Sequence, residues 1–337
     1  MTAPMPNGGK FVQTVRGILP VEQLGFCQCH EHLFIAKGQS FTVNPALWLD
    51  NLEKTKREVL SFRDAGGAAL VDAQPVGCGR MADYLLATAK ETGVEIIAST
   101  GFHKLQFYPE NHWIFNADED FLTSLFLAEL RTGMYLDGDR HLPVKQLPAR
   151  AGIIKIALDN VGISGPYIKL FKAAACAALH TGTPILCHVE TENHVFNAID
   201  FFSKQGIEAQ SIILCHLDRV KCDPAFHREV AKSGVYLEYD TIGRFKYHSD
   251  EEEIKLLRQM LAYGLEDQIL LGLDTTRKRM KSYGGSIGLD YILTAFIPRL
   301  IKSGVPGKTI DKLTIANPRQ ALALKVKGGP APAGTMP

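Results

Sequence analysis

The sequence predicts an α/β fold, a (β/α)8 TIM barrel in which eight parallel strands alternate with helices. Three observations lead to this prediction. Eight short apolar runs recur along the chain, and most of them end in a polar or ionisable residue. The runs are rich in Ile, Val, Leu and Cys and lack polar–apolar alternation, which is typical of parallel strands buried on both faces. Helical signals fill the intervals between them.

The predicted strands also indicate where a functional face would lie. In a barrel, the loops that follow the strands form this face. The two long connections, residues 101–150 and 275–290, should therefore shape a substrate site. The eight strands are predicted at residues 25–32, 68–73, 95–100, 152–158, 184–190, 211–218, 235–240 and 268–274.

Three intervals between strands carry specific helix signals. Ser249 and Glu252 have the spacing of a capping box. Asp223 precedes Pro224, the usual order of an N-cap and a first helical residue. Residues 167–179 are rich in alanine, the strongest helix former. These signals place helices between successive strands, as a barrel requires.

The chain shows no Ser/Gly linker and no charge block that would divide it. Its 337 residues would allow two domains at ~150 residues each, but one barrel can reach this size. We therefore expect a single barrel over residues 11–327, a flexible tail over residues 1–10 and a disordered tail over residues 328–337. A doubly wound open sheet is the alternative, which the lack of a Gly-x-Gly-x-x-Gly sequence after the first strand disfavours.

Composition excludes several classes of protein. The 37 basic and 36 acidic residues give a net charge of +1, so a strongly basic nucleic-acid surface is not expected for the chain as a whole. Apolar runs fall far short of the ~20 residues of a membrane helix, and the first ten residues lack the apolar core of a secretory signal. The seven cysteines are an odd number and predict reduced thiols in a cytoplasmic protein.

Residues of metal-ligand type lie at the ends of several predicted strands. His30 and His32 end the first strand, and residues two apart on a strand point to the same side. His188, His216 and Asp274 end three further strands. Imidazole and carboxylate groups that meet at one rim suit Zn, Mn, Co or Ni. The alternative for any single histidine is an ordinary polar residue at a strand end.

Lys155 is unusual because it lies within an apolar run that includes Ile153, Ile154 and Ile156. A charged amine there is costly to desolvate, so it needs a partner or a lowered pKa. It is either one member of a buried ion pair, a side chain that reaches solvent, or a chemically modified residue. A neutral amine can add carbon dioxide to form a carbamate, whose two oxygens can bridge two cations.

Cysteines precede two of the strand-end histidines. Strand alternation would point Cys187 and Cys215 away from the metals, so we expect them to pack against helices, as we do Cys27 and Cys29. Asp240 ends the seventh strand and could contact either the substrate or the hydrogen-bond partners of the ligands.

Taken together, these residues resemble those of the phosphotriesterase family of the amidohydrolase superfamily. The resemblance covers about residues 11–325 and rests on Thr14-Val15-Arg16-Gly17, on the His30-Glu31-His32 motif, on Arg-Ala-Gly-Ile-Ile-Lys at 150–155, on His188, His216 and Asp274, and on Ala316-Asn317-Pro318. It implies a TIM barrel of the metal-dependent hydrolase type, a homodimer, and two divalent ions per chain, with Zn favoured.

The resemblance also implies a role for each ligand. His30, His32 and Asp274 would hold the more buried metal, and His188 and His216 the more exposed one. A carbamate on Lys155 (N6-carboxylysine) and a hydroxide would bridge the two metals. Asp274 would be the catalytic residue that orients the hydroxide, takes its proton and passes it toward the leaving alcohol.

Basic residues are concentrated in the loops that follow the seventh and eighth strands. Four of the five residues at 277–281 are cationic, and these loops often hold phosphate in barrels. The alternative is a solvated basic loop. The predicted substrate-binding residues are Arg244, Lys246, Tyr247, Arg277, Arg279, Lys281 and Tyr283.

These loops resemble those of the sugar-lactone branch of the family, which hydrolyses phosphorylated furanose lactones. The leading hypothesis is therefore a metal-dependent lactonase that opens a small anionic substrate, a phosphorylated sugar lactone. One alternative is a lactonase or phosphotriesterase for uncharged lactones or organophosphate esters. An alternative of another class is a metal-containing barrel that binds a ligand without turnover.

Overall fold

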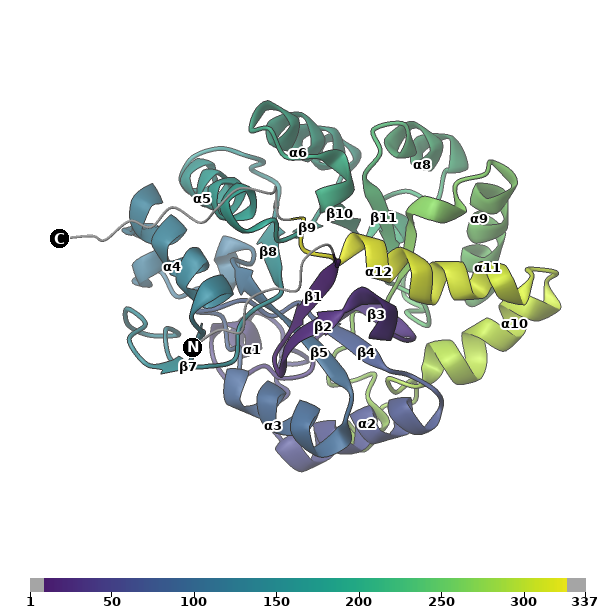
Figure 1. Ribbon diagram of the computed structural model, residues 1–337, viewed down its shortest axis with the longest axis horizontal. Helices are drawn as coiled ribbons and strands as arrows, with labels where there is room; N and C mark the ends of the chain where they lie inside the picture. The colour runs from purple at the N-terminus through teal and green to yellow at the C-terminus, as the bar shows by residue number, and fades with distance from the viewer. Residues whose placement is uncertain (1–8, 326–337) are drawn as a thin grey trace.

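Eight parallel strands form the centre of the computed structural model, which describes residues 9–325 (Figure 1). Their order in the sheet is β12-β11-β10-β9-β8-β5-β4-β3. The strands are β3 (Cys27–Glu31), β4 (Ala69–Asp72), β5 (Glu95–Gly101), β8 (Ile153–Ala157), β9 (Ile185–His188), β10 (Ile212–Cys215), β11 (Tyr236–Tyr239) and β12 (Ile269–Leu271). All eight predicted strands are confirmed.

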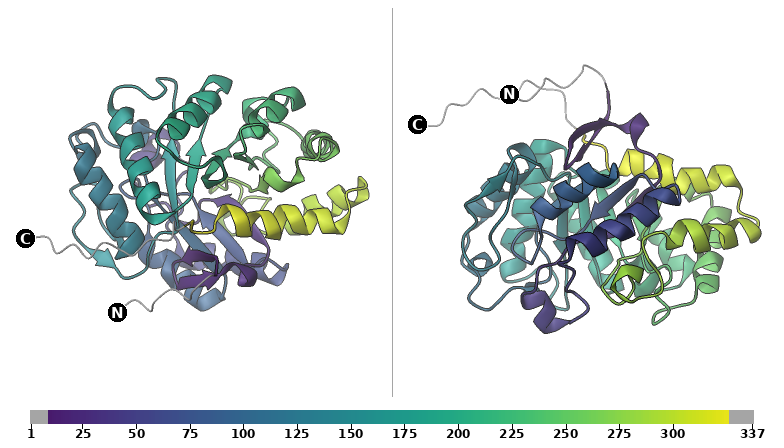
Figure 2. Two further views of the ribbon diagram at one scale, coloured as in Figure 1. Left: turned by 45° about the horizontal axis from the view of Figure 1, so that its top comes forward. Right: turned by 90° about the horizontal axis from the view of Figure 1, so that it is seen from below.

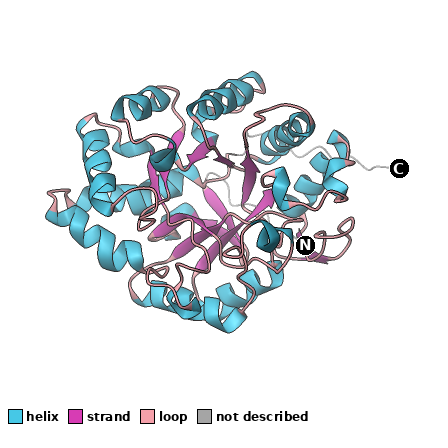
Figure 3. Cartoon of the chain, turned by 180° about the vertical axis from the view of Figure 1, so that it is seen from behind, coloured by secondary structure: helices cyan, strands magenta, loops and turns pink. Residues whose placement is uncertain are grey.

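The first and last strands meet and close the barrel. The backbone N–H groups of Leu273 and Asp274 donate hydrogen bonds to the carbonyl of His30, at 3.3 and 3.0 Å. A ring of helices surrounds the strands, as Figure 3 shows from behind. The expected (β/α)8 barrel is therefore observed, and the open doubly wound sheet is not.

The helices lie between successive strands and cover the outside of the barrel. Ser249 and Glu252 form the predicted capping box, and Asp223 caps the helix that begins at Pro224. The helices are α1 (Gln39–Val43), α2 (Leu52–Asp64), α3 (Ala82–Thr92), α4 (Glu119–Arg131), α5 (Pro166–Thr181), α6 (Glu192–Lys204), α7 (Leu217–Val220), α8 (Pro224–Ala231), α9 (Asp250–Ala262), α10 (Ile297–Lys302), α11 (Gly307–Asp311) and α12 (Asn317–Ala321), with π-helical turns at Ile292–Phe296 and Lys312–Ala316.

A β-hairpin covers the amino-terminal end of the barrel (Figure 2, right). Its strands are β1 (Phe11–Thr14) and β2 (Gly17–Pro20), and a second short pair, β6 (Met134–Tyr135) and β7 (Gln146–Leu147), lies in the long third loop. Val12, Leu24 and Leu322 pack with the side chains that fill the barrel. This end is therefore closed by apolar packing, which leaves the carboxyl ends of the strands as the open face. The tails predicted at residues 1–10 and 328–337 lie, apart from residues 9 and 10, outside the described residues.

The cysteine predictions are correct for one strand and wrong for the others. Cys187 packs in the layer between strands and helices, as expected. Cys27, Cys29 and Cys215 instead face the barrel interior. Alternation fails beside Cys215 because the next residue, His216, has a left-handed backbone with φ 65°, and a register shift between Gln28 and Glu31 has the same effect on β3.

Among the residues that the structure describes, no helix combines the length and the apolar character needed to cross a bilayer.

Candidate metal centre and active site

The carboxyl ends of five strands bring the six predicted ligand residues together. His30 lies on β3 with His32 just beyond it, Lys155 lies on β8, and His188 ends β9. The other two, His216 and Asp274, follow β10 and β12, and all six are buried. The metal-ligand pattern read from the sequence thus corresponds to one cluster in space.

One part of the cluster is a group of three potential ligands. Asp274 Oδ1 lies 3.5 Å from His32 Nε2 and 4.0 Å from His30 Nε2. The three side chains each offer one ligand atom, all within 4.8 Å of one another. Lys155 Nζ is 3.4 Å from His30 Nε2.

The other part of the cluster is a pair of histidines. His188 Nδ1 lies 2.7 Å from His216 Nε2. The ring of His216 also lies beside that of His30, with centroids 4.9 Å apart. The pair and the group of three are therefore neighbours, close enough for one two-metal site.

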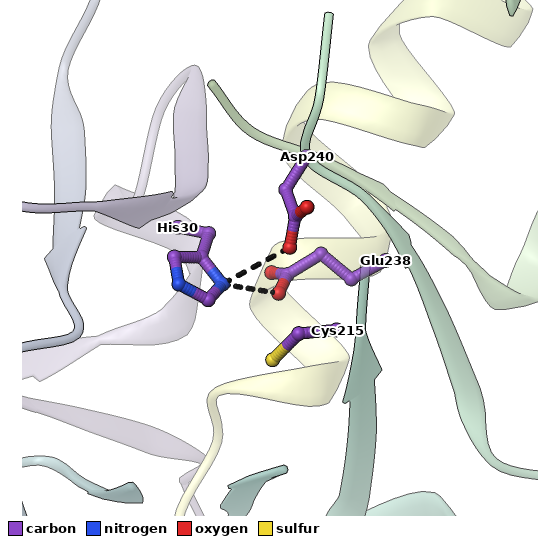
Figure 4. Close-up of side chains that lie close together, drawn as sticks. All are labelled: His30, Cys215, Glu238 and Asp240. Atoms are coloured by element: carbon purple, nitrogen blue, oxygen red, sulfur yellow. Dashed lines mark hydrogen bonds and ion pairs between the residues drawn. The ribbon is translucent and has the colours of Figure 1, made fainter. Parts of the chain in front are cut away.

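The outer nitrogens of three of these histidines face carboxylates. His30 Nδ1 is 2.8 Å from Glu238 and 3.1 Å from Asp240, as Figure 4 shows. His216 Nδ1 is 2.6 Å from the other oxygen of Asp240, and His188 Nε2 is 3.2 Å from Glu190. Ionised carboxylates only accept hydrogen bonds, so they favour the proton on these outer nitrogens. Such carboxylate–histidine pairs are typical of metal ligands.

This arrangement fits a metal. With protons on the outer nitrogens, His188 Nδ1 and His216 Nε2 face each other as two lone pairs only 2.7 Å apart. Lone pairs at this distance repel unless a cation lies against both. In addition, His32 Nδ1 and Glu238 Oε1 are buried without a hydrogen-bond partner. The donor set of imidazoles and a carboxylate suits Zn and its neighbours in the first transition row.

The protonation states also suit metal binding. Burial lowers the pKa of His32, lowers that of His188 far below its usual value, and, with Arg219, lowers that of His216 to about 3. These imidazoles are therefore neutral at pH 7 and have a lone pair free. For His30, burial and Lys155 oppose protonation, but Glu238 and Asp240 outweigh them and raise its pKa to about 9. A cation on Nε2 would take the place of that extra proton.

Backbone strain marks two of the candidate ligands. Among residues 9–325, His216 and Asp274 are the non-glycine residues with positive φ, at 65° and 48°. A left-handed conformation is costly for such residues and tends to occur where a side chain must be aimed at a functional site. Here it turns both side chains toward the barrel axis just beyond their strands.

Glu238 is a functional candidate that sequence reasoning missed. It lies on β11 two residues before Asp240, so the same spacing that revealed His30 and His32 could have revealed it. We expect Glu238→Gln to weaken metal affinity by about 10- to 100-fold, the usual effect of losing an outer partner of a metal ligand. Competition with a chromogenic chelator measures this, with the exposed Glu229→Gln as control. Equal affinity in the two variants would contradict the assignment.

Two arginines contact Asp274, and both lie against the ring of Tyr247. Arg244 Nη1 donates to Asp274 Oδ2, and Arg219 Nη1 lies 3.6 Å from the same oxygen. Both guanidinium groups lie over the Tyr247 ring, at 5.5 and 5.3 Å from its centroid, and Lys246 Nζ is 4.4 Å from it. Burial alone would raise the pKa of Tyr247, but Arg219, Lys246 and Arg244 lower it. Arg219 was also missed, although it follows His216 by only three residues.

The other predicted substrate residues have contacts elsewhere. The buried Arg279 donates to the backbone carbonyls of Leu273, Asp274 and Ile242 and so joins the seventh and eighth loops. Arg277 stacks on the rings of Trp48 and Tyr283. The Lys281 amine forms an ion pair with both oxygens of Asp290, each at 2.7 Å. The Tyr283 hydroxyl forms hydrogen bonds with the Thr55 hydroxyl and the Asn51 carbonyl. The structure thus brings Arg244 into contact with the cluster and links Tyr247 and Lys246 to it only through the arginines and the Tyr247 ring. Arg277, Lys281 and Tyr283 have partners away from the cluster.

Comparison with known proteins assigns this architecture to a family. A sequence model of the Phosphotriesterase family matches residues 10–322. The chain belongs to the phosphotriesterase family. The resemblance inferred from the sequence motifs is thereby confirmed.

Relatives similar to this chain are named for different hydrolytic activities. The chain is 31% identical to the phospho-furanose lactonase of Mycoplasmopsis agalactiae, over 93% of this chain and 92% of the relative. It is 28% identical to the N-acetyltaurine hydrolase of Danio rerio, over 93% and 98%. Among solved structures, an amidohydrolase from Mycoplasma synoviae superposes with a TM-score of 0.90 at 29% identity, covering 95% of this chain and 94% of that one.

Proposed function

We propose that the chain is a metal-dependent hydrolase that opens the ring of a phosphorylated furanose lactone. The observation that carries the proposal is the position of Asp274 between two different environments. Its Oδ1 faces His30 and His32, whereas its Oδ2 faces Arg244 and Arg219. A candidate metal centre and a pair of guanidinium groups therefore meet at one carboxylate, as hydrolysis of an ester bond in an anionic substrate requires.

Two divalent cations, with Zn favoured, are part of this proposal. His30, His32 and Asp274 would hold one, and His188 and His216 the other. When bound, the pair would lower the pKa of a shared water and polarise the ester carbonyl. The homodimer implied by the family belongs to the same proposal, and light scattering would test it.

Lys155 would complete the centre as a carbamate. Its side chain is fully buried, and its Nζ lies near His30 Nε2 at 3.4 Å and Cys215 Sγ at 3.9 Å. Within the described part of the chain, no carboxylate forms an ion pair with this amine. Addition of carbon dioxide to this amine would turn the buried side chain into an anionic ligand for the two cations. The product would be an anion beside His30.

The remaining steps use side chains of this chain. Asp274 would orient the attacking oxygen through Oδ1, accept its proton and move that proton toward the leaving alkoxide. Arg244 and Arg219 would bind the phosphate, since guanidinium groups match its oxygens with paired hydrogen bonds. A phosphate bound there would draw Arg244 away from Asp274 Oδ2 and leave that carboxylate free to act as the base.

Arg244→Ala tests the anion-binding part of the proposal. Loss of one charge-assisted contact costs about 1.5–3 kcal/mol, or roughly 10- to 100-fold in kcat/KM for the phosphorylated lactone. The unphosphorylated lactone should lose much less. The matched control is Lys281→Ala, because Asp290 already holds that amine. Equal losses on the two lactones would show that Arg244 does not bind phosphate.

A second candidate function follows from the same two arginines. Arg219 and Arg244 recognise an anion rather than a phosphate in particular, and the N-acetyltaurine of the Danio rerio relative carries a sulfonate. Hydrolysis of an N-acyl aminosulfonate is therefore the alternative with structural support. Uncharged lactones and organophosphates lack the group that these cations would hold, and filled ligand positions disfavour a barrel that binds without turnover.

A further inference from the structure

A second cluster of ligand-type residues lies behind the active-site loops, and the proposed hydrolysis makes no use of it. Its members are Asp218 on α7, His248 in the loop after β11 and Glu253 on α9, and all three are buried. Each offers one ligand atom within 4.8 Å of the others. The cluster thus joins three segments that follow two neighbouring strands.

Glu253 is the feature that this packing leaves unexplained. The residue is 1% exposed, and neither carboxylate oxygen has a hydrogen-bond partner. Its Oε2 points toward His248, with Nε2 at 3.3 Å. Burial, together with the nearby carboxylates Asp218, Asp240 and Asp250, raises its pKa well above the usual range. The counter-charge within reach of Glu253 is His248, where burial opposes protonation but Asp218 and the Ser249 carbonyl outweigh it and raise the pKa.

The hydrogen bonds around His248 leave another electron pair in the same pocket. His248 Nδ1 faces the Ser249 carbonyl at 3.2 Å, which can only accept a hydrogen bond, so Nδ1 carries the proton of a neutral ring. Nε2 then presents a lone pair 2.8 Å from the Thr241 hydroxyl oxygen. That hydroxyl donates its own proton to Asp218 Oδ2 at 2.6 Å. With a neutral His248 ring, free electron pairs on His248 Nε2, Glu253 Oε2, Asp218 Oδ2 and Thr241 Oγ1 would therefore meet in this pocket.

We propose that Asp218, His248 and Glu253 form a binding site for one further divalent cation of the Zn²⁺ class, separate from the centre on the barrel axis. One imidazole and two carboxylates are a donor set that Zn²⁺ accepts, and Thr241 Oγ1 offers a fourth oxygen. The cation would fasten the loop that carries Arg244 and Tyr247 to α7 and α9. The competing explanation is a doubly protonated His248 between the two carboxylates. The proposal does not depend on the substrate.

Anomalous diffraction at the zinc edge tests the site on the unaltered chain. Crystals of the full protein grown with Zn²⁺ should give a peak bonded to His248 Nε2, Asp218 and Glu253, besides any peaks on the barrel axis. No peak there, in crystals whose barrel centre holds zinc, overturns the proposal in favour of the imidazolium. The barrel peaks report on the proposed hydrolase centre separately, so failures of the two are distinguishable.

The zinc content of variants provides a second test of the proposed site. After dialysis against micromolar Zn²⁺, Glu253→Gln should bind about one equivalent less per chain than the unaltered protein. The control is Glu251→Gln on the same helix, whose side chain is 75% exposed and outside the cluster. Equal zinc content in a folded Glu253→Gln protein contradicts the proposal. If this variant does not fold, the diffraction measurement decides alone.

Discussion

Lys155→Ala is expected to lose both metals and to lower kcat by more than about 100-fold. Replacing an outer partner of a metal ligand already costs about 10- to 100-fold, and Lys155 is proposed to bridge the two ions directly. A short carboxylic acid with bicarbonate should restore part of the metal content and the rate, because the acid can occupy the space of the lost side chain and supply an anionic bridge.

Metal analysis and the rate of lactone opening measure this prediction together. Lys172→Ala is the control, since that amine is exposed and lies outside the barrel. Lys155→Met separates the two roles of the lysine, because it fills the apolar space without supplying a ligand. A Lys155→Met protein with two metals and an unchanged rate would show that Lys155 only packs.

Asp274→Asn is expected to lower kcat by about 100- to 10,000-fold, the usual contribution of a general base. The amide keeps the shape of the side chain but cannot take up the proton. KM for the phosphorylated lactone should change little, because Arg219 and Arg244 remain in place. Steady-state kinetics measure both constants, with the exposed Asp200→Asn as control. A kcat within about threefold of the unaltered enzyme would exclude Asp274 as the base.

The barrel, and the meeting of the candidate ligand residues at one rim, could be predicted from the sequence because each depends on a local pattern. Buried parallel strands require continuous apolar runs, and these runs are short, frequent and unambiguous. His30, His32, His188, His216 and Asp274 lie where such runs end. Since the carboxyl ends of all barrel strands meet at one rim, the position of a residue along its own strand is sufficient to place it in the site.

The directions of the side chains in the two basic loops could not be predicted in this way. The direction of a loop side chain depends on backbone turns and on distant partners. The Arg279 side chain donates a hydrogen bond to a backbone carbonyl at the end of its own strand, and the Lys281 amine forms an ion pair with Asp290. The contact of Arg219 with the site could not be predicted, because the left-handed backbone of His216 changes the direction of the chain after β10. Such features depend on tertiary contacts rather than on periodicity.

The most direct test of the central claim is a comparison of matched lactones on the metal-loaded enzyme. Furanose lactones with and without a 5-phosphate would be followed by proton release, with N-acetyltaurine alongside and a chelator-treated sample as the blank. The account predicts metal-dependent opening with at least about a tenfold preference in kcat/KM for the phosphorylated ring. Equal or faster opening of the uncharged lactone, or no metal-dependent hydrolysis of either, would contradict it.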